Sequence, residues 1–339
     1  MRLRQNLPMK IPATTTASKN DPRLEQARRW LQQLGVNPQP GFHPVAGDAS
    51  FRRYFRLQIG GKSRILMDAP PPGDDLRPFL DRDQRLRSAE LDAPEIIHAD
   101  TQNGFLLLED LGDDLYRGLL DENSADSLFP ALFTVLKTMA LTVDANNLPN
   151  YDRQLLQTEM NLFPNWYLGH HRKTMSRKRF DKIWAGFCEH IIDSALAQPR
   201  CFVHRDFHSC NLLKTGHDRI GVIDFQDAVN GPVSYDFISL VWDRYIQWPR
   251  RRIENWMEAF RLLLDHEIDP EDWQRQCDWM GLQRNIKIVG IFARLNYRDG
   301  KNGYIEMIPR FYDYVLDTLR RYPEFEPMLE ILENPECAP

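Results

Sequence analysis

The hydrophobic pattern of the chain changes character at residues 110–113. Upstream, short runs of alternating apolar residues are bounded by glycine, proline and asparagine, which is typical of strands joined by tight turns. Downstream, apolar residues recur every three or four positions over long stretches, which is typical of amphipathic helices. A chain of 339 residues is long enough to bury two cores. We therefore expect an α+β fold with a small antiparallel sheet in an N-terminal lobe and a larger, mainly helical C-terminal lobe.

The order of the elements follows from the turn and cap residues. A first helix is indicated by Asp21 as N-cap, by Pro22 in the first turn and by Gly35 at the end of the apolar periodicity. The next expected elements are a β-hairpin over 51–67 with its turn at Gly60-Gly61, a helix over 76–86, and strands over 95–99 and 105–109. Further helices are expected near 124–145, 152–168, 177–198, 234–247, 250–267, 270–291 and 300–321, with one short β element at 212–213 and 220–223. The expected organisation is a flexible extension over 1–20, an N-lobe over 21–110, a C-lobe over 111–325 and a tail over 326–339.

The charges and the cysteines of the chain restrict its partners and its location. The 43 Lys and Arg are outnumbered by 48 Asp and Glu, and the resulting net charge of −5 disfavours nucleic-acid binding. The 5 cysteines are scattered without a C-x-x-C pair, which argues against a disulfide framework and against structural zinc. No charge-free apolar run approaches the ~20 residues that span a bilayer. We expect a cytoplasmic protein that binds neither nucleic acid nor a membrane.

The motif with the most chemical content lies within the helical half. It runs from His204 through Asp206 to Asn211 in the pattern H-x-D-x-x-x-x-N, and an apolar strand that ends at Asp224 follows it. Phosphoryl transfer needs a carboxylate that accepts the proton of a hydroxyl, together with oxygen ligands for Mg²⁺. Asp206, Asn211 and Asp224 are of these types, and their spacing lets them meet at a metal. The alternative is that the two acids only end a turn and a strand, with Asn211 as a cap.

This motif resembles that of the aminoglycoside-phosphotransferase and protein-kinase-like superfamily, and the resemblance extends over residues 42–320. It implies a two-lobed, protein-kinase-like fold and the use of ATP and Mg²⁺. It also implies that Asp206 is the catalytic base, that His204 braces the catalytic loop, and that Asn211 and Asp224 are the metal ligands.

The segment after the metal-binding Asp distinguishes the chain from protein kinases. Those enzymes continue from D-F-G into a long segment that holds a peptide, whereas here Asp224-Phe225-Gln226 is soon followed by Asp236 at the start of the next helix. We therefore expect a small-molecule acceptor. Asp236 itself is interpreted as an N-cap or as an anchor of the loop.

Two segments of the N-lobe lie where this superfamily binds its nucleotide. Residues 46–53 correspond to the loop that covers the phosphates, and residues 105–112 resemble the hinge whose backbone binds adenine. The candidate contacts are Gly47, Ser50, Arg52 and Arg53 in the loop, and Glu109 and Leu111 in the hinge. The alternatives are an ordinary turn before a strand and a plain edge strand with its linker.

One position departs from the superfamily pattern. The strand that should present a lysine to the phosphates has Met67 instead, so another cation is required. Arginine binds phosphate through two parallel hydrogen bonds, and Arg52, Arg53 or Arg64 could replace the lysine. The acidic partner expected on the following helix is Asp81, Asp83 or Glu90.

A narrower resemblance concerns the acceptor. The stretches 47–56, 67–71, 107–112 and 224–228 are similar to those of bacterial anomeric sugar kinases of cell-wall recycling, which phosphorylate N-acetylmuramate and N-acetylglucosamine at the 1-hydroxyl. The resemblance implies a small-molecule sugar acceptor and a nucleotidyltransferase that uses the sugar 1-phosphate. The candidate sugar contacts are Glu159, Trp166, His208, Arg294 and Asn296.

Each sugar contact has a structural alternative, and so has the function. Trp166 could be a core aromatic residue, Glu159 could lie on a solvated helix face, and His208 could brace the catalytic loop. The other functions are a kinase for a different small hydroxyl compound, such as an aminoglycoside, an amino alcohol or another sugar, and a nucleotide-binding pseudokinase. The absence of the lysine at Met67 favours the pseudokinase, whereas the intact set Asp206, Asn211 and Asp224 favours an enzyme.

Overall fold

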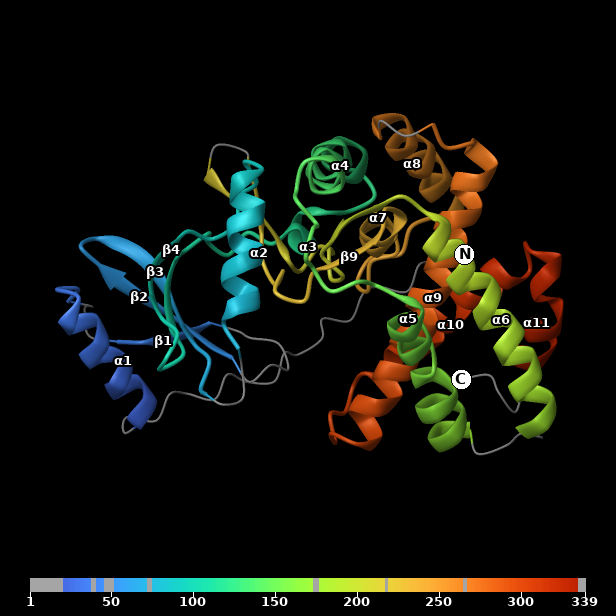
Figure 1. Cartoon of the computed structure of the whole chain (residues 1–339), viewed down its shortest axis with the longest axis horizontal. Coiled ribbons are helices and arrows are strands. Elements are labelled where there is room, and N and C mark those ends of the chain that lie inside the picture. Colours follow the sequence, from blue (N-terminus) through green and yellow to red (C-terminus); the bar gives the residue numbers. More distant parts are fainter. Residues whose placement is uncertain are drawn as a thin grey trace.

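The computed structural model describes residues 21–37, 41–45, 52–71, 75–172, 177–216, 219–264 and 267–334. Its first part is an antiparallel five-stranded sheet in the order β1-β2-β3-β5-β4 (Figure 1). The strands are β1 (His43–Val45), β2 (Arg53–Ile59), β3 (Lys62–Asp68), β4 (Ile96–Asp100) and β5 (Phe105–Glu109). The expected extension over 1–20 and the loop candidates Gly47 and Ser50 lie outside the described residues.

The hairpin of β2 and β3 forms as its sequence predicts. Gly60 and Gly61 both have positive φ, of 56° and 77°, as the two central residues of a tight hairpin turn require. The turn sets the register, which pairs Phe55 with Leu66. Because strand side chains alternate between faces, the two faces of this sheet differ sharply in what they contact.

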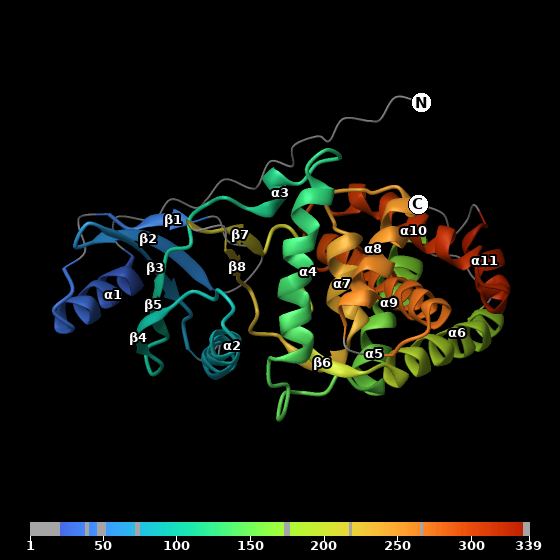
Figure 2. The same ribbon diagram turned by 90° about the horizontal axis from the view of Figure 1, so that it is seen from above.

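Helix α1 (Pro22–Gln33) covers one face of the sheet, as Figure 2 shows. The Asp21 side chain caps it by accepting the backbone N–H of Arg23 at 2.9 Å. Its apolar residues pack on alternate residues of the strands in a small separate core, composed of Leu24, Ala27, Leu31, Phe55, Leu57, Leu66, Phe105 and Leu107. The buried Asp68 carboxylate accepts hydrogen bonds from the guanidinium groups of Arg23 and Arg53, which joins the helix to the edge of this core.

Helix α2 (Arg77–Ser88) covers the opposite face. This face carries Met67, Leu106 and Leu108, which belong to the main core of the protein. The ring of Phe79 lies 4.8 Å from the ring of Phe225, so α2 contacts the segment that directly follows Asp224. The sheet and the second half of the chain are therefore connected by packing as well as by the linker after β5.

The second part of the chain is mostly helical and begins after residue 115 (Figures 1 and 2). Its elements are α3 (Tyr116–Leu119), α4 (Ala125–Leu141), α5 (Arg153–Met160), a π-helix over Phe163–Arg172, α6 (Arg177–Ala197), α7 (Ser234–Val241), α8 (Arg250–Leu263), α9 (Pro270–Tyr297), α10 (Ile308–Leu319) and α11 (Glu326–Leu332). Within the described ranges, no helix combines the length and the apolar character that a membrane crossing needs. These elements and the sheet confirm the expected α+β class with an antiparallel N-terminal sheet.

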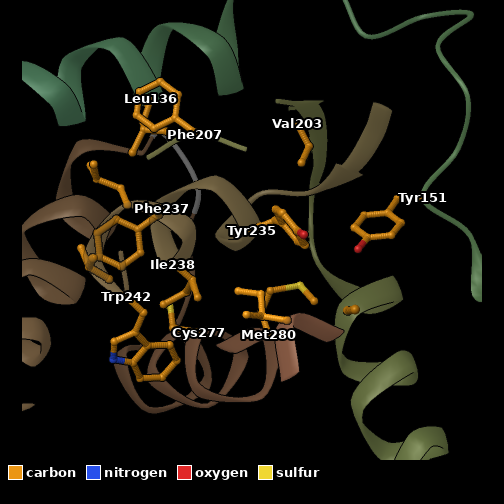
Figure 3. Packing of buried hydrophobic residues seen from close by; sticks show 14 of the residues in the cluster. Leu136, Tyr151, Val203, Phe207, Tyr235, Phe237, Ile238, Trp242, Cys277 and Met280 are labelled. Atoms are coloured by element: carbon orange, nitrogen blue, oxygen red, sulfur yellow. The ribbon is translucent and has the colours of Figure 1, made fainter. Parts of the chain in front are cut away.

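Helix α9 is the central element of this part, because α5, α6, α7, α8 and α10 all pack on it. Figure 3 shows Ile238 and Trp242 beside Cys277 and Met280 of α9. Two glycines of α9 allow especially close packing. A Cβ at Gly281 would lie 1.5 Å from the Trp242 ring, and a Cβ at Gly290 would lie 2.4 Å from the backbone of Leu162.

Two features differ from the sequence-based expectation. The strands β6 (Arg200–Val203) and β9 (Val229–Pro232) pair with each other and were not predicted, because each has only four residues and β9 contains Gly and Pro. The predicted pair β7 (Leu212–Lys214) and β8 (Ile220–Val222) is present. The expected tail is instead a packed helix up to residue 332, since Met328 and Leu332 of α11 are fully buried.

The close contact at Gly281 gives a stability prediction. We expect Gly281→Ala to lower the free energy of unfolding by about 3 kcal/mol or more, because the added methyl group overlaps a rigid, buried indole ring. The matched control is Gly186→Ala in α6, where no atom lies within 4 Å of the added Cβ. There we expect a gain of about 1 kcal/mol from helix propensity. Urea unfolding of both variants tests this, and equal stabilities would contradict the packing described.

Candidate active site

The candidate catalytic loop connects β6 to β7 and begins at His204. The imidazole of His204 is fully buried, and its Nε2 lies 2.9 Å from the carbonyl oxygen of Ile223. Its Nδ1 accepts the backbone N–H of Asp206 at 3.3 Å. His204 therefore connects the loop to the strand end that precedes Asp224, which is the bracing position that the sequence motif implied.

Asp236, in the first turn of α7, fixes the start of the same loop. Its two carboxylate oxygens accept the backbone N–H groups of His204 at 2.5 Å and Arg205 at 3.0 Å. Burial raises the pKa of Asp236 to about 6, although these hydrogen bonds favour the charged form. Of its two sequence interpretations, the structure supports the loop anchor, since Val233 occupies the N-cap of α7.

Asp206, Asn211 and Asp224 converge at the open end of this loop. The Asn211 amide nitrogen donates to the backbone carbonyl oxygen of Asp206 at 2.9 Å and lies 3.4 Å from a carboxylate oxygen of Asp224. The other carboxylate oxygen of Asp224 accepts the side-chain N–H of Gln226 at 2.9 Å. Because the amide nitrogen of Asn211 is engaged, its oxygen is available to a cation. Asn211 and Asp224 thus offer the oxygen ligands that Mg²⁺ prefers.

Backbone strain and charge both concentrate at this point. Arg205 and Asp224 are non-glycine residues with φ of 77° and 67°, a left-handed conformation that is typically retained at functional sites. Burial and the neighbouring Asp206 carboxylate raise the pKa of Asp224. Two carboxylates so close together repel each other, and a bound cation would relieve that repulsion.

The Asp206 carboxylate is 39% exposed, as a group that meets a substrate must be. Burial alone would raise its pKa, but the guanidinium of Arg244, 2.9 Å away, and the more distant His208, Lys287 and Arg284 hold it well below the ordinary value. Asp206 is therefore ionised at neutral pH and can accept a hydrogen bond from an acceptor hydroxyl.

Behind the loop lies a buried charge network around Glu159 of α5. Its carboxylate accepts hydrogen bonds from Arg205 at 2.5 Å, Lys287 of α9 at 2.8 Å and Gln283 of α9 at 3.0 Å, and also from the hydroxyl of Tyr151. Burial disfavours the charge on Glu159, but Lys287 and Arg205 outweigh it and lower its pKa. With all these partners inside the protein, Glu159 positions Arg205 rather than presenting a free carboxylate to a sugar.

The other candidate sugar contacts lie in two places. His208 is buried beside Asp206, where its Nδ1 accepts the backbone N–H of Cys210 at 3.3 Å, so it braces the loop. Trp166 lies in the π-helix and packs on His170, whose ring also faces Tyr297 at the end of α9. Arg294 and Asn296 belong to that same end of α9. Arg294 is seven positions after Lys287, so Arg294 and Asn296 lie about 10 Å or more along α9 from Lys287.

The structure also places the candidate nucleotide-binding residues in different parts of the N-terminal lobe. Glu109 ends β5, and Leu111 lies over Gly221 of β8, where an added Cβ would come within 2.8 Å of its side chain. The hinge therefore borders the β7–β8 hairpin that leads to Asp224. Arg53 lies on the α1 face of the sheet, where Asp21 and Asp68 bind its guanidinium, and the structure does not bring it to the Met67 face.

Two further arginines were candidates for the missing cation. Arg64 also lies on the α1 face, because it is two positions before the buried Leu66 on β3 and residues two apart on a strand face the same side. Arg52 directly precedes β2 and is partly buried, and it stays the candidate at the phosphate loop.

The structure distinguishes the three acidic candidates of α2 and its end. Asp81 pairs with Arg85 at the surface, and Glu90 is exposed beyond the helix. Asp83 is 4% exposed, and one of its carboxylate oxygens has no hydrogen-bond partner among the described residues. It is one turn beyond Phe79 on the inner face of α2. Burial raises the pKa of Asp83 to about 7.

Three basic residues near Asp206 were missed by the sequence analysis. Arg244 comes from the segment after α7, while Arg284 and Lys287 lie one turn apart on α9. No local motif marks them among the 43 Lys and Arg of the chain. The apolar residues around Arg284 and Lys287 in the sequence of α9 could have marked them, since a cation on a buried helix face needs an anionic partner.

The chain is similar to known proteins over most of its length. Residues 41–275 match the model of the phosphotransferase enzyme family. A protein of Pseudomonas putida named N-acetylmuramate/N-acetylglucosamine kinase is 40% identical over 330 residues, which cover 93% of this chain and 97% of that protein. A protein of Neisseria meningitidis with the same name is 37% identical over 322 residues, with 90% and 93% covered.

Solved structures with the same fold are more distant in sequence. A choline kinase from Streptococcus pneumoniae superposes with a TM-score of 0.63 at 12% identity, covering 88% of this chain and 99% of that one. An aminoglycoside phosphotransferase with ADP bound gives a TM-score of 0.56 at 15% identity, covering 86% and 96%. These likenesses establish the two-lobed, kinase-like fold.

The buried Asp83 gives a prediction about pH. Its pKa is 3.8 in an ordinary environment and about 7 in the folded protein, so between these values the folded state binds more protons than the unfolded state. The contribution of Asp83 to stability is complete below pH 4 and is lost as pH rises through 7. We expect the stability of Asp83→Asn relative to the wild type to increase by about 2–3 kcal/mol between pH 5 and pH 8.

Urea unfolding at the two pH values measures this difference. Asp81→Asn on the same helix is the matched control, because its carboxylate is 41% exposed and paired with Arg85. If the advantage of Asp83→Asn were the same at pH 5 and pH 8, the carboxylate of Asp83 would not be buried without a partner.

Proposed function

Because this chain belongs to the phosphotransferase enzyme family, we propose that it transfers the γ-phosphoryl group of ATP to the anomeric 1-hydroxyl of N-acetylmuramate and of N-acetylglucosamine. The observation that carries this proposal is the 40% identity over 93% of the chain to a kinase named for these two sugars. The geometry of Asp206, Asn211 and Asp224 supports it, because these residues supply the groups that phosphoryl transfer needs.

The proposed base is Asp206. Its partly exposed carboxylate orients the 1-hydroxyl and accepts its proton as the bond from the 1-oxygen to the γ-phosphorus forms. The bond from that phosphorus to the β,γ-bridging oxygen of ATP breaks, and ADP leaves. An anomeric hydroxyl is more acidic than an ordinary alcohol, so a carboxylate of low pKa can still serve as the base. His204 and Asp236 act as positioning residues, since both bind the backbone that carries Asp206.

The nucleotide would lie between the lobes. The backbone at Glu109 and Leu111 is proposed to bind adenine, and the segment 46–53 to cover the phosphates, with Arg52 replacing the lysine that is absent at Met67. Asn211 and Asp224 are proposed to hold Mg²⁺, which neutralises the charge of the phosphates.

The charges around Asp206 disfavour acceptors that are cations. Aminoglycosides and amino alcohols are cations, and Arg244, Arg284 and Lys287 would repel them from this side of the site. A pseudokinase is disfavoured because the chain retains the proposed base and the proposed metal ligands, together with the hydrogen bonds that hold their loop.

The reaction also implies a place in metabolism. The product is a sugar 1-phosphate, the usual substrate of a nucleotidyltransferase, so we infer that such an enzyme consumes it in peptidoglycan recycling. ATP and Mg²⁺ are abundant in the cytoplasm, and we infer that the enzyme acts there.

The first test concerns Asp206 and the product together. With Mg-ATP, we expect both amino sugars to give an anomeric phosphate in phosphorus NMR, whereas kanamycin gives no product. Asp206→Asn should lower turnover about 10²- to 10⁴-fold while ATP binding and the fold are retained, because the amide cannot accept the proton. Asp181→Asn, at an exposed position of α6, is the control. Near-normal turnover by Asp206→Asn, or phosphate on another hydroxyl, would contradict the proposal.

A further inference from the structure

Positively charged side chains gather on the side of the proposed base, Asp206, that faces α9. Arg244 approaches Asp206 directly, with its Nη2 atom 2.9 Å from a carboxylate oxygen. The guanidinium is 21% exposed, so it borders the open site. Arg244 thus lies within reach of an acceptor whose hydroxyl binds to Asp206.

The segment that carries Arg244 is held firmly against the catalytic loop. The carboxylate of Asp243 accepts the backbone N–H groups of Ser209 at 2.8 Å and Tyr245 at 2.7 Å. The backbone carbonyl oxygen of Arg244 accepts a hydrogen bond from Arg310 of α10 at 2.9 Å. The backbone of Arg244 is therefore fixed, and its side chain can exchange one anionic partner for another.

A second guanidinium, that of Arg284, contacts the backbone two residues before Arg244. It is 2% exposed and makes one hydrogen bond, from Nη1 to the carbonyl oxygen of Trp242 at 3.2 Å. Its Nη2 has no hydrogen-bond partner, and within the described part of the chain Arg284 makes no ion pair. Burial, together with the charge of Arg244, lowers the pKa of Arg284. A buried guanidinium without an anion is costly, which indicates that a ligand completes this site.

None of the nearby carboxylates can serve as the missing anionic partner of Arg284. Glu159 is occupied by Arg205 and Lys287, and both Asp236 and Asp243 accept backbone N–H groups. Asp206 is shared with Arg244 and is needed as the base. The acceptor side of the site thus has more positive than negative charge.

The position of these cations separates them from the proposed nucleotide. Asn211 and Asp224, the proposed magnesium ligands, lie on the side of Asp206 that faces α2 and the sheet, since Phe225 contacts Phe79. Arg244 and Arg284 come from the segment after α7 and from α9, in the helical part. An anion that they bind therefore belongs to the acceptor.

We propose that Arg244 and Arg284 form a carboxylate-binding site for the acceptor, and that they bind the lactyl carboxylate of N-acetylmuramate. This inference rests on the proposed function. Of the two proposed sugars, only N-acetylmuramate carries a carboxylate, on the carbon-3 oxygen of the ring that also bears the reacting 1-hydroxyl. Binding of that carboxylate draws Arg244 away from Asp206 and leaves the base free for the 1-hydroxyl. N-acetylglucosamine lacks this group and must compete with the ion pair.

The test compares N-acetylmuramate with its neutral carboxamide derivative, in which an amide replaces the carboxylate and the 1-hydroxyl is unchanged. The quantity measured is the ratio of kcat/KM for the acid to kcat/KM for the amide. We expect the wild type to prefer the acid, and Arg244→Gln to lower this ratio about 10- to 100-fold, mainly through KM for the acid. Arg244→Lys should recover part of the preference, because it keeps the charge but not the planar fork.

Two controls keep the result specific. Arg153→Gln removes one positive charge from an exposed ion pair with Asp193 on α6, and it should keep the wild-type ratio. Arg284→Gln should lower the ratio like Arg244→Gln. If Arg284→Gln does not fold, the Arg244 variants and the wild-type comparison still decide the question.

The outcomes separate this inference from the proposed function. If the wild type phosphorylates the acid and the amide equally well, or if Arg244→Gln reduces both to the same extent, the carboxylate site is wrong while the sugar kinase activity stands. If neither N-acetylmuramate nor N-acetylglucosamine is phosphorylated, the proposed function fails and this inference fails with it.

Discussion

The geometry of the candidate active site depends on one buried carboxylate, that of Asp236. Its two oxygens accept the first two backbone N–H groups of the catalytic loop, at His204 and Arg205. These bonds stabilise the left-handed backbone of Arg205, directly before Asp206, whose side chain is partly exposed. Without this acceptor, two buried N–H groups would lack partners and the strained turn would relax. Asp236 therefore fixes the position of the proposed base through the backbone of the loop.

The charge network behind the loop makes the same turn rigid from the other side. Arg205 points inward to Glu159, which also holds Lys287 of α9. Because α9 is the helix on which most of the helical part packs, this network connects the catalytic loop to the centre of the core. Buried ion pairs of this kind contribute little net stability, but removing one partner leaves an uncompensated charge. We interpret the network as a means of fixing the loop in one conformation.

The sequence predicted those parts of the structure that depend on local pattern. The α1 cap at Asp21, the turn at Gly60-Gly61 and the strand over 105–109 are each encoded within a few residues, and all three are present. The catalytic loop was recognisable because its chemistry requires fixed residue types at fixed spacing. Arg244 and Arg284 could not be predicted, since their meaning depends on which distant segments fold against Asp206. Arg53 and Glu159 were misinterpreted for the same reason: their partners, Asp68 and Lys287, lie far away in the sequence.

The two sides of Asp206 differ in charge, and this difference suits an in-line transfer. On the side of the sheet, the proposed metal ligands Asp224 and Asn211 offer oxygen atoms, and the negative charge there would favour a metal cation. On the side of α9, Arg244, Arg284 and Lys287 provide an excess of positive charge that calls for an anionic or neutral acceptor. In the proposed transfer, the phosphoryl group would move from the first side to the second past Asp206, and its negative charge would be matched at both ends. The same positive charge would disfavour a cationic acceptor at this site, although proteins of the same fold include a choline kinase and an aminoglycoside phosphotransferase.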